Sequence, residues 1–302
     1  DSEHGDGRQD EVSGAVPVPE GPLIGRDAEL TLIAERLADP DCRWLTVVGP
    51  GGVGKTRLVL AAAQALAPRF RHGALWFSGR DEVTALGDPE SLAHRVIDRI
   101  GADRVHAGAL LLVLDNLETV PEPGQLVRRL LARAPGVRLL VTSRRRLGGS
   151  REWLLELSGL SLARQGPDPQ AGSPAAALLT AAVRRLDPRF DPVAEAEAVE
   201  RLCARVGGLP LALELAARGV LDAGLRAVLA RVESGAPLED RERDDGERHH
   251  SIAAVMAEAW STLPPDAQAT VLRLAWLPGA FDLELAEVAG ASSPAVEVLR
   301  SQ

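Results

Sequence analysis

Short apolar runs alternate with amphipathic stretches over the first half of the chain. The runs are RWLTVV (43–48), ALWF (74–77), ALLLVL (109–114), VRLLVT (137–142) and EWLLEL (152–157). Helical spacing begins at Asp27 and returns between the runs over 56–66, 89–100 and 124–134. Continuous apolar strands that alternate with helices are typical of a parallel sheet covered on both faces. The pattern therefore predicts an α/β fold with a five-stranded, mostly parallel sheet.

The strand pattern fades after about residue 160, and helical spacing replaces it. In the stretch DPVAEAEAVERLCARVGG, Asp191 is the expected N-cap, Pro192 lies in the first turn and Gly207 ends the helix. Two more helices are expected over about 209–219 and 221–233. Together these helices predict a small helical unit after the sheet.

The remaining segments have simpler patterns. Residues 1–21 are polar and rich in Gly and Pro, which predicts a flexible linker. The charged stretch EDRERDDGER (239–248) is most simply a solvated linker. Segment 250–302 is helical again, with two helices broken at LPGAF. His249 and His250 suggest a metal, but adjacent histidines after a charged linker are more often solvated.

Composition narrows the class of protein. The 302 residues carry a net charge of −9, and 45% are hydrophobic but only 3% aromatic, so the cores must be aliphatic. The net negative charge argues against a protein whose whole surface binds nucleic acid. A local basic patch is still compatible with this charge. Because no apolar run approaches the ~18 residues of a membrane span and no signal peptide opens the chain, we expect no membrane contact.

The cysteines point to a cytoplasmic protein. Cys42 and Cys203 lie far apart and have no metal-ligand spacing. We interpret them as reduced core thiols rather than as a disulfide, which is usual in the cytoplasm. The chain does not begin with Met, so we expect it to be a piece of a larger protein.

The stretch GPGGVGKT, residues 49–56, follows a predicted strand and opens a helix, and it matches G-x-x-x-x-G-K-[ST]. Backbone N–H groups of such a P-loop surround phosphate oxygens at the positive end of the helix. Lys55 would reach the β- and γ-phosphates, and the Thr56 hydroxyl would bind Mg²⁺. Lys55 is the only lysine among 34 basic residues. A compact ammonium fits a phosphate cradle, whereas a planar guanidinium is larger and suits bidentate partners.

Two further strands end in polar residues. Asp115 follows the run ALLLVL, at the strand end where a P-loop protein needs a carboxylate for Mg²⁺. Without the P-loop, an Asp that caps a turn would explain this residue equally well. Arg144 follows the run VRLLVT and is placed to sense a γ-phosphate. We interpret Arg145 and Arg146 as a solvated pair. Asn116 is the single asparagine, and no lysine follows it, so the guanine-specific N-K-x-D motif is excluded and ATP or ADP is the expected ligand.

These motifs, in this order, resemble the NB-ARC (AP-ATPase) branch of the signal-transduction ATPases with numerous domains (STAND). The resemblance is to the bacterial kind found in transcriptional regulators of the antibiotic-regulatory and LuxR types, and it covers about 22–302. PLIGRDAEL (22–30) is similar to the entry motif of the family, GPGGVGKTRL and LLLVLDNLE to its Walker A and B motifs, LLVTSR to its sensor, and GGLPLALELAA (207–217) to its GxP motif. Residues 248–290 resemble the opening of its winged-helix domain.

The resemblance assigns roles to particular residues. Ile24, Gly25 and Arg26 would touch the adenine and ribose, and Pro210 would pack on the adenine. The nucleotide-binding set that we expect is Ile24, Gly25, Arg26, Gly49, Pro50, Gly51, Gly52, Val53, Gly54, Lys55, Thr56, Arg57 and Pro210. The catalytic set is Lys55, Asp115, Glu118 and Arg144, and the Mg²⁺ ligands are Thr56 and Asp115.

One departure from the family bears on catalysis. Asn116 stands where many relatives outside this bacterial branch carry a second acid, which predicts slow hydrolysis. Glu118 is a candidate substitute base, and the alternative is that it is a surface residue.

The expected domains are a linker (1–21), a P-loop nucleotide-binding domain (22–160), a helical lid (161–237) and the truncated start of a winged helix (238–302).

The resemblance implies an ATP/ADP-dependent switch that responds to an unknown inducer or sensor domain, associates with itself in the ATP state and regulates an attached effector of the transcriptional kind. Two alternatives stay open: a constitutive P-loop ATPase or kinase-like enzyme, and a module that binds DNA through the winged helix. Residues 250–302 lack a basic, base-reading helix, so direct DNA binding is not expected.

Overall fold

A computed structural model describes most of the chain. The described residues are 15–19, 21–79, 88–101, 110–164, 172–234 and 263–274, together with the single positions 238, 260, 286 and 296. The charged stretch, the two adjacent histidines and the LPGAF break all lie outside the described residues.

Five parallel strands form the sheet. They are β1 (Trp44–Val48), β2 (Ala74–Ser78), β3 (Leu110–Asp115), β4 (Val137–Ser143) and β5 (Trp153–Glu156), in the order β2-β3-β4-β1-β5. The prediction of a five-stranded parallel sheet is confirmed. Because β4 lies between β1 and β3, the residues that follow β4 fall between those that follow the other two strands.

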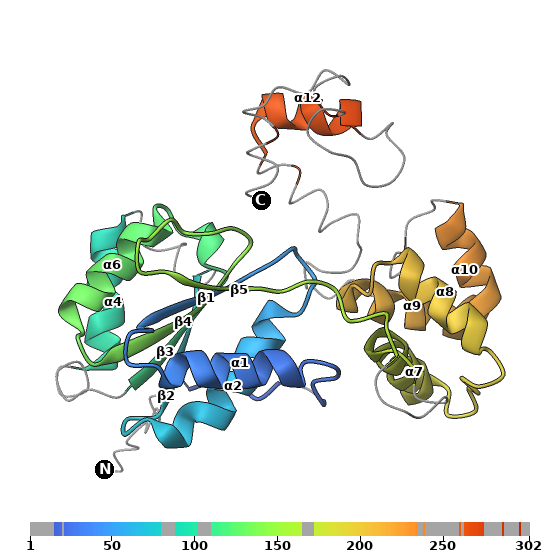
Figure 1. The fold of residues 1–302 in the computed structure, drawn as a ribbon, viewed down its shortest axis with the longest axis horizontal. Coiled ribbons are helices and arrows are strands. Elements are labelled where there is room, and N and C mark those ends of the chain that lie inside the picture. Colours follow the sequence, from blue (N-terminus) through green and yellow to red (C-terminus); the bar gives the residue numbers. More distant parts are fainter. Residues whose placement is uncertain are drawn as a thin grey trace, which may run out of the picture.

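Helices cover both faces of this sheet (Figure 1). Helices α1 (Asp27–Ala38) and α2 (Lys55–Leu66) lie on one face, and α4 (Pro89–Ile100) and α6 (Pro123–Arg133) lie on the other. Two short 3₁₀ helices, η1 (Ala67–Arg69) and η2 (Leu117–Thr119), follow α2 and β3. Alternate residues of a strand point to opposite faces, so Leu110, Leu112 and Leu114 of β3 pack under α4 and α6. Leu111 and Val113 pack under α1 and α2.

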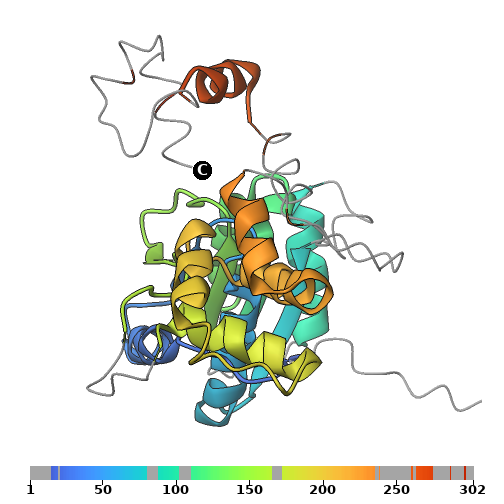
Figure 2. The same ribbon diagram turned by 90° about the vertical axis from the view of Figure 1, so that its right-hand side faces the viewer.

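A helical unit follows the sheet. It consists of α7 (Pro174–Leu186), α8 (Ala196–Arg205), α9 (Pro210–Ala223) and α10 (Leu225–Glu233), and Figure 2 shows it in front of the sheet. Its aliphatic core is separate from the two cores of the sheet and also contains Leu160 and Leu238. The sequence pattern missed α7, although Ser173 caps it by accepting the Ala176 N–H and Pro174 occupies its first turn.

The predicted boundaries of the later helices need two corrections. Asp191 is not the N-cap of α8: its carboxylate accepts the N–H groups of Val193 and Ala194 in a turn that precedes the helix. The break between α9 and α10 lies at Gly224 rather than near residue 220, because a φ of 82° suits glycine. Gly207 ends α8 as predicted, with a φ of 62°.

The ends of the chain are described in part. Near the N-terminus, Val16 packs against the core under α1 and α2, and the Pro17 carbonyl accepts a hydrogen bond from Gln64, so this part of the predicted linker lies against α2. In the last segment, α12 (Pro265–Leu274) is described. Of the helices described, none is long and apolar enough to cross a membrane.

Both cysteines are buried and unpaired, as expected. Burial raises the pKa of the Cys42 thiol to about 11 and that of the Cys203 thiol to about 12. Because the thiolate is the reactive form, these groups act as small core residues rather than as nucleophiles.

Candidate functional site

The P-loop, residues 49–56, connects β1 to α2 at the carboxyl edge of the sheet. Gly54 is the N-cap of α2 with a φ of 95°, and Gly52 has a φ of 76°, which side chains other than glycine rarely adopt. Lys55 and Thr56 form the first turn of α2. The turn and the positive end of the helix together make the geometry that binds phosphate groups.

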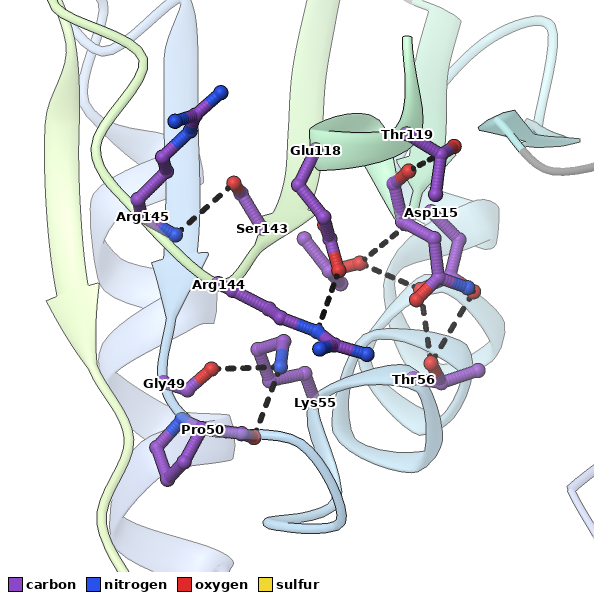
Figure 3. Close-up of polar contacts among 12 residues, drawn as sticks. Gly49, Pro50, Lys55, Thr56, Asp115, Glu118, Thr119, Ser143, Arg144 and Arg145 are labelled. Atoms are coloured by element: carbon purple, nitrogen blue, oxygen red, sulfur yellow. Dashed lines mark hydrogen bonds and ion pairs between the residues drawn. The ribbon is translucent and has the colours of Figure 1, made fainter. Parts of the chain in front are cut away.

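The Lys55 ammonium lies over the P-loop itself. Its Nζ donates to the carbonyl oxygens of Gly49 at 2.7 Å and Pro50 at 3.0 Å (Figure 3), and the residue is only 7% exposed. Because Lys55 is the first residue of α2, its charge adds to the positive end of that helix.

Asp115 lies opposite the P-loop and is the centre of a hydrogen-bond network. The Thr56 hydroxyl donates to its carboxylate at 2.9 Å, and the Thr142 hydroxyl donates to the same oxygen at 2.6 Å. The Asn116 amide donates to the second oxygen at 2.7 Å. These contacts exclude the reading of Asp115 as a residue that merely caps a turn.

The environment of Asp115 opposes its negative charge. Burial, at 3% exposure, raises the pKa of its carboxyl group, and the hydrogen bonds from Thr142 and Thr56 lower it in part. The charge of Glu118 raises the pKa further, and the charge of Lys55 lowers it. A divalent cation at the carboxylate would remove this electrostatic penalty.

The oxygen atoms of Thr56 and Asp115 fit Mg²⁺, which prefers hard oxygen ligands and takes few of them from the protein. Within the part of the chain that the structure describes, no group of three or more His, Cys, Asp or Glu side chains could hold a metal. Mg²⁺ at a nucleotide usually takes most of its ligands from phosphate oxygens and water, so two oxygen-bearing side chains are compatible with such a site.

Arg144 and Glu118 form an ion pair between the P-loop and Asp115. Arg144 Nε lies 3.3 Å from Glu118 Oε1, with the side chains 14% and 13% exposed (Figure 3). Glu118 Oε2 is buried without a hydrogen-bond partner among the described residues. Glu118 is thus directed into the site, and the alternative that it is a surface residue is wrong.

The two following arginines take no part in this cluster. Arg145 and Arg146 are exposed, and Figure 3 shows the Arg145 side chain directed away from Lys55. Arg146 pairs with Glu156 at 2.7 Å on the surface. The interpretation of these two residues as a solvated pair is confirmed.

The residues expected at the adenine and ribose lie together at the edge of the P-loop. A small hollow of about 30 Å³ is lined by Ile24, Arg26, Val53, Gly54, Arg57 and Pro210, among others. Gly25 instead packs against the start of α7: a Cβ on it would lie 2.5 Å from Pro174 Cβ.

Arg26 is nearly buried and connects separate segments. Its guanidinium donates to the carbonyl oxygens of Val53 at 3.3 Å and Ser158 at 2.6 Å, and it pairs with Glu29 at 2.7 Å. Arg26 therefore holds the P-loop to the segment that leaves β5.

The start of α9 rests directly on the P-loop. The Leu211 N–H donates to the Gly52 carbonyl at 3.2 Å, and a Cβ on Gly52 would lie 2.8 Å from Leu211 Cβ. Arg57 of α2 pairs with Glu214 of α9 at 3.1 Å. The helical unit and the sheet therefore meet at the site itself.

Sequence reasoning missed four residues of this arrangement: Thr142, Ser158, Leu211 and Glu214. Thr142 could have been predicted from the sequence, since a polar residue near the end of a buried strand indicates a candidate site residue. Ser158 acts through its carbonyl and Leu211 through its N–H, which every residue type offers, so no residue pattern could reveal them.

No protein-family model matches the chain, but comparisons with known proteins find relatives. The chain is 30% identical to the uncharacterized protein Rv0894 of Mycobacterium tuberculosis over 290 residues, which cover 89% of this chain and 69% of that protein. It is 27% identical to the regulatory protein AfsR of Streptomyces griseus, over 88% of this chain and 28% of AfsR. Among solved structures, the STAND protein PH0952 of Pyrococcus horikoshii aligns with 96% of this chain and 40% of its own at 17% identity and a TM-score of 0.41.

A five-stranded parallel sheet with a G-x-x-x-x-G-K-T loop between β1 and α2 defines a P-loop NTPase fold. The extent of the match to Rv0894 places the chain in the same family as that protein. The expected resemblance to bacterial regulators is confirmed by the match to AfsR, of which the chain spans less than a third.

Proposed function

We propose that this chain is an ATP/ADP-dependent molecular switch, the regulatory core of a larger signalling protein. The observation that carries the proposal is the contact between Leu211 and Gly52, because it joins the helical unit to the loop that would hold phosphates. A ligand that contacts two structural units can shift the equilibrium between their arrangements. The size of the shift is set by the difference in the ligand's binding free energy between the two arrangements.

Each residue of the site has a distinct task in this proposal. Lys55 and the N-terminal end of α2 bind the phosphates, while Thr56 and Asp115 would hold Mg²⁺, which supplies charge neutralisation when it is bound. Arg144 is the group that would respond to the third phosphate. Ile24, with Pro210 of the helical unit, would enclose the base.

The small hollow at the base position supports a closed arrangement. Its volume of about 30 Å³ is far below the ~300 Å³ of ordinary ligand sites. A base would enter only if α9 moved relative to the P-loop, and nucleotide exchange would thereby be coupled to the position of the helical unit. The relationship to the regulatory protein AfsR supports a regulatory role, and we propose that the attached effector is transcriptional.

The first test is to denature one portion of the purified protein and identify any nucleotide that it releases. A second portion, freed of nucleotide under native conditions, is titrated by calorimetry with ADP, ATP and GTP in the presence of Mg²⁺. We expect bound ADP and a preference for adenine nucleotides. The Pro210→Gly variant should show a smaller rise in melting temperature with ADP than the wild type. Binding of ADP that is identical in the two proteins would contradict a role of the helical unit in the site.

The same preparation distinguishes the alternatives. Rapid turnover without any partner would favour a constitutive ATPase. A salt-sensitive shift of DNA by this fragment in a gel would favour a DNA-binding module.

A further inference from the structure

A second cavity lies at the opposite edge of the sheet from the P-loop. Its volume is about 490 Å³, within the range of sites for small organic molecules. The walls come from the end of α1, the end of α2 with η1, and the turn between α6 and β4. Arg43 precedes β1 and Val137 begins β4, so the cavity lies at the amino edge of the sheet, whereas the P-loop follows the carboxyl end of β1.

One part of the wall is apolar. Leu37 from α1, Leu66 from α2 and Val137 from β4 are buried below the cavity, and Phe70 is half-buried at its side. This surface could cover the hydrocarbon or aromatic body of a ligand, which gains free energy by leaving water.

The other part is basic. Arg43, Arg69 and Arg138 line the same cavity, and its lining contains no Asp or Glu. Within the described part of the chain, no carboxylate forms an ion pair with any of these three arginines. The nearby Asp39 carboxylate accepts the Asp41 N–H instead.

Two of the guanidiniums are held in place by backbone groups. Arg43 Nη2 donates to the carbonyl oxygens of Leu131 and Ala134, at 3.2 Å and 3.0 Å, at the end of α6. Arg138 Nη1 donates to the carbonyl oxygens of Asp39 and Cys42, the latter at 2.8 Å. These bonds use one nitrogen of each guanidinium, so other N–H groups and the whole charge stay available.

The charges of this cluster repel one another. Burial lowers the pKa of Arg43 below its usual value, and the charges of Arg138 and Arg151 lower it further. An anion in the cavity would relieve this repulsion and accept hydrogen bonds from guanidinium groups that are already positioned.

From the cavity, its apolar wall and its three arginines, we infer that this is a binding site for a small organic anion with an apolar body, such as an aromatic or aliphatic carboxylate. The site is separate from the nucleotide site, but three elements connect them. At the cavity, β4 contributes Val137 and α2 contributes Leu66, and β1 begins directly after Arg43. At their other ends, β1 and β4 lead into Gly49 and Arg144, and α2 begins with Lys55.

The probe for a direct test is 2-naphthoate, titrated into the full chain by calorimetry. Its neutral relative 2-naphthamide has the same shape without the charge, and inorganic phosphate has the charge without the apolar body. We expect 2-naphthoate to bind at least ~10-fold more tightly than either compound, which corresponds to about 1.4 kcal/mol.

Two variants locate the site. Ala38 is exposed at the rim, so Ala38→Trp should fill the cavity without disturbing the core, and Arg69→Gln removes one charge at an exposed position. Both should weaken 2-naphthoate binding at least ~5-fold, since a charge-assisted hydrogen bond or the space itself is lost. Arg71→Gln is the matched control, because Arg71 is exposed near the cavity but does not line it.

Three results would overturn the inference. They are the absence of 2-naphthoate binding at millimolar concentration, equal binding of 2-naphthamide, and wild-type affinity in the Ala38→Trp variant. A fourth titration uses the Lys55→Ala variant: unchanged affinity for the probe is expected there, and a loss would mean that the probe occupies the P-loop. None of these results depends on whether the proposed nucleotide switch is correct.

Discussion

Arg144 Nε lies 3.3 Å from Glu118 Oε1, and both side chains are almost excluded from solvent between the P-loop and Asp115. The residue that we propose as the γ-phosphate sensor is therefore already paired with the candidate base for hydrolysis. A phosphate group that attracted Arg144 would compete with Glu118 for the guanidinium and would leave the carboxylate available to a water molecule.

This geometry predicts slow hydrolysis of ATP, well below the ~1–100 s⁻¹ of dedicated phosphoryl-transfer enzymes. Asp115 is expected to be engaged with Mg²⁺, and the Asn116 amide donates to Asp115 and cannot accept a proton from water. Single-turnover hydrolysis is the measurement. Glu118→Gln should reduce the rate by ~100-fold or more if Glu118 is the base, and Asn116→Asp should raise the rate of the wild type. Fast turnover in the unmodified protein would contradict the switch.

Lys55→Arg is expected to impair nucleotide binding nearly as much as Lys55→Ala, by at least ~10-fold for each. The ammonium is 7% exposed and lies within 3.0 Å of two carbonyl oxygens of its own loop, so a larger planar guanidinium would displace the loop. Calorimetric titration with ATP on both variants tests this. Wild-type affinity in Lys55→Arg would show that the single lysine of the chain has no special role.

Gly52→Ala should destabilise the protein by ~1–3 kcal/mol more than Gly73→Ala. The two glycines have similar φ values of 76° and 70°, so the backbone strain on substitution is similar. A Cβ at Gly52 would collide with Leu211, whereas a Cβ at Gly73 meets nothing within 4 Å. Chemical denaturation of both variants without nucleotide gives the comparison. Equal stabilities would mean that α9 does not rest on the P-loop in solution.

Asp115→Asn should raise the melting temperature of the nucleotide-free protein at neutral pH and abolish Mg²⁺-dependent nucleotide binding. Burial raises the pKa of this carboxyl group, so the folded state binds its proton more tightly than the unfolded state does. The contribution of Asp115 to stability therefore falls as pH rises from the unfolded pKa of ~3.9 through the raised folded pKa.

An asparagine carries no charge to be desolvated, so this pH-dependent loss should be absent from the variant. Melting curves at several pH values, with and without Mg²⁺, test the prediction. A lower melting temperature of Asp115→Asn at neutral pH without Mg²⁺ would contradict it.

Thr142→Val is a useful second variant: the loss of the 2.6 Å hydrogen bond should raise the pKa of Asp115 further and weaken Mg²⁺ binding as pH falls.

The strands were predictable to within a residue or two because each contains a short, mostly apolar run, and the three central strands β1, β3 and β4 are buried along nearly their whole length. Leu110 and its successors in β3 are all buried, so no polar residue interrupts the signal. The P-loop was equally clear, since its glycines and Lys55 have fixed spacing. By contrast, helix α7 was missed, although Ser173 and Pro174 mark its start.

Residue types at short spacing determined the local geometry of this protein, because backbone and capping preferences act over a few residues. The sequence by itself therefore showed which segments are strands, where the P-loop turns and which acid ends β3. Only the tertiary structure decided that β4 separates β1 from β3, that Glu118 turns toward Arg144, and that α9 lies on Gly52. Those relationships depend on contacts such as Arg57 with Glu214, which are 157 residues apart in the chain, and such pairs form through the packing of whole surfaces.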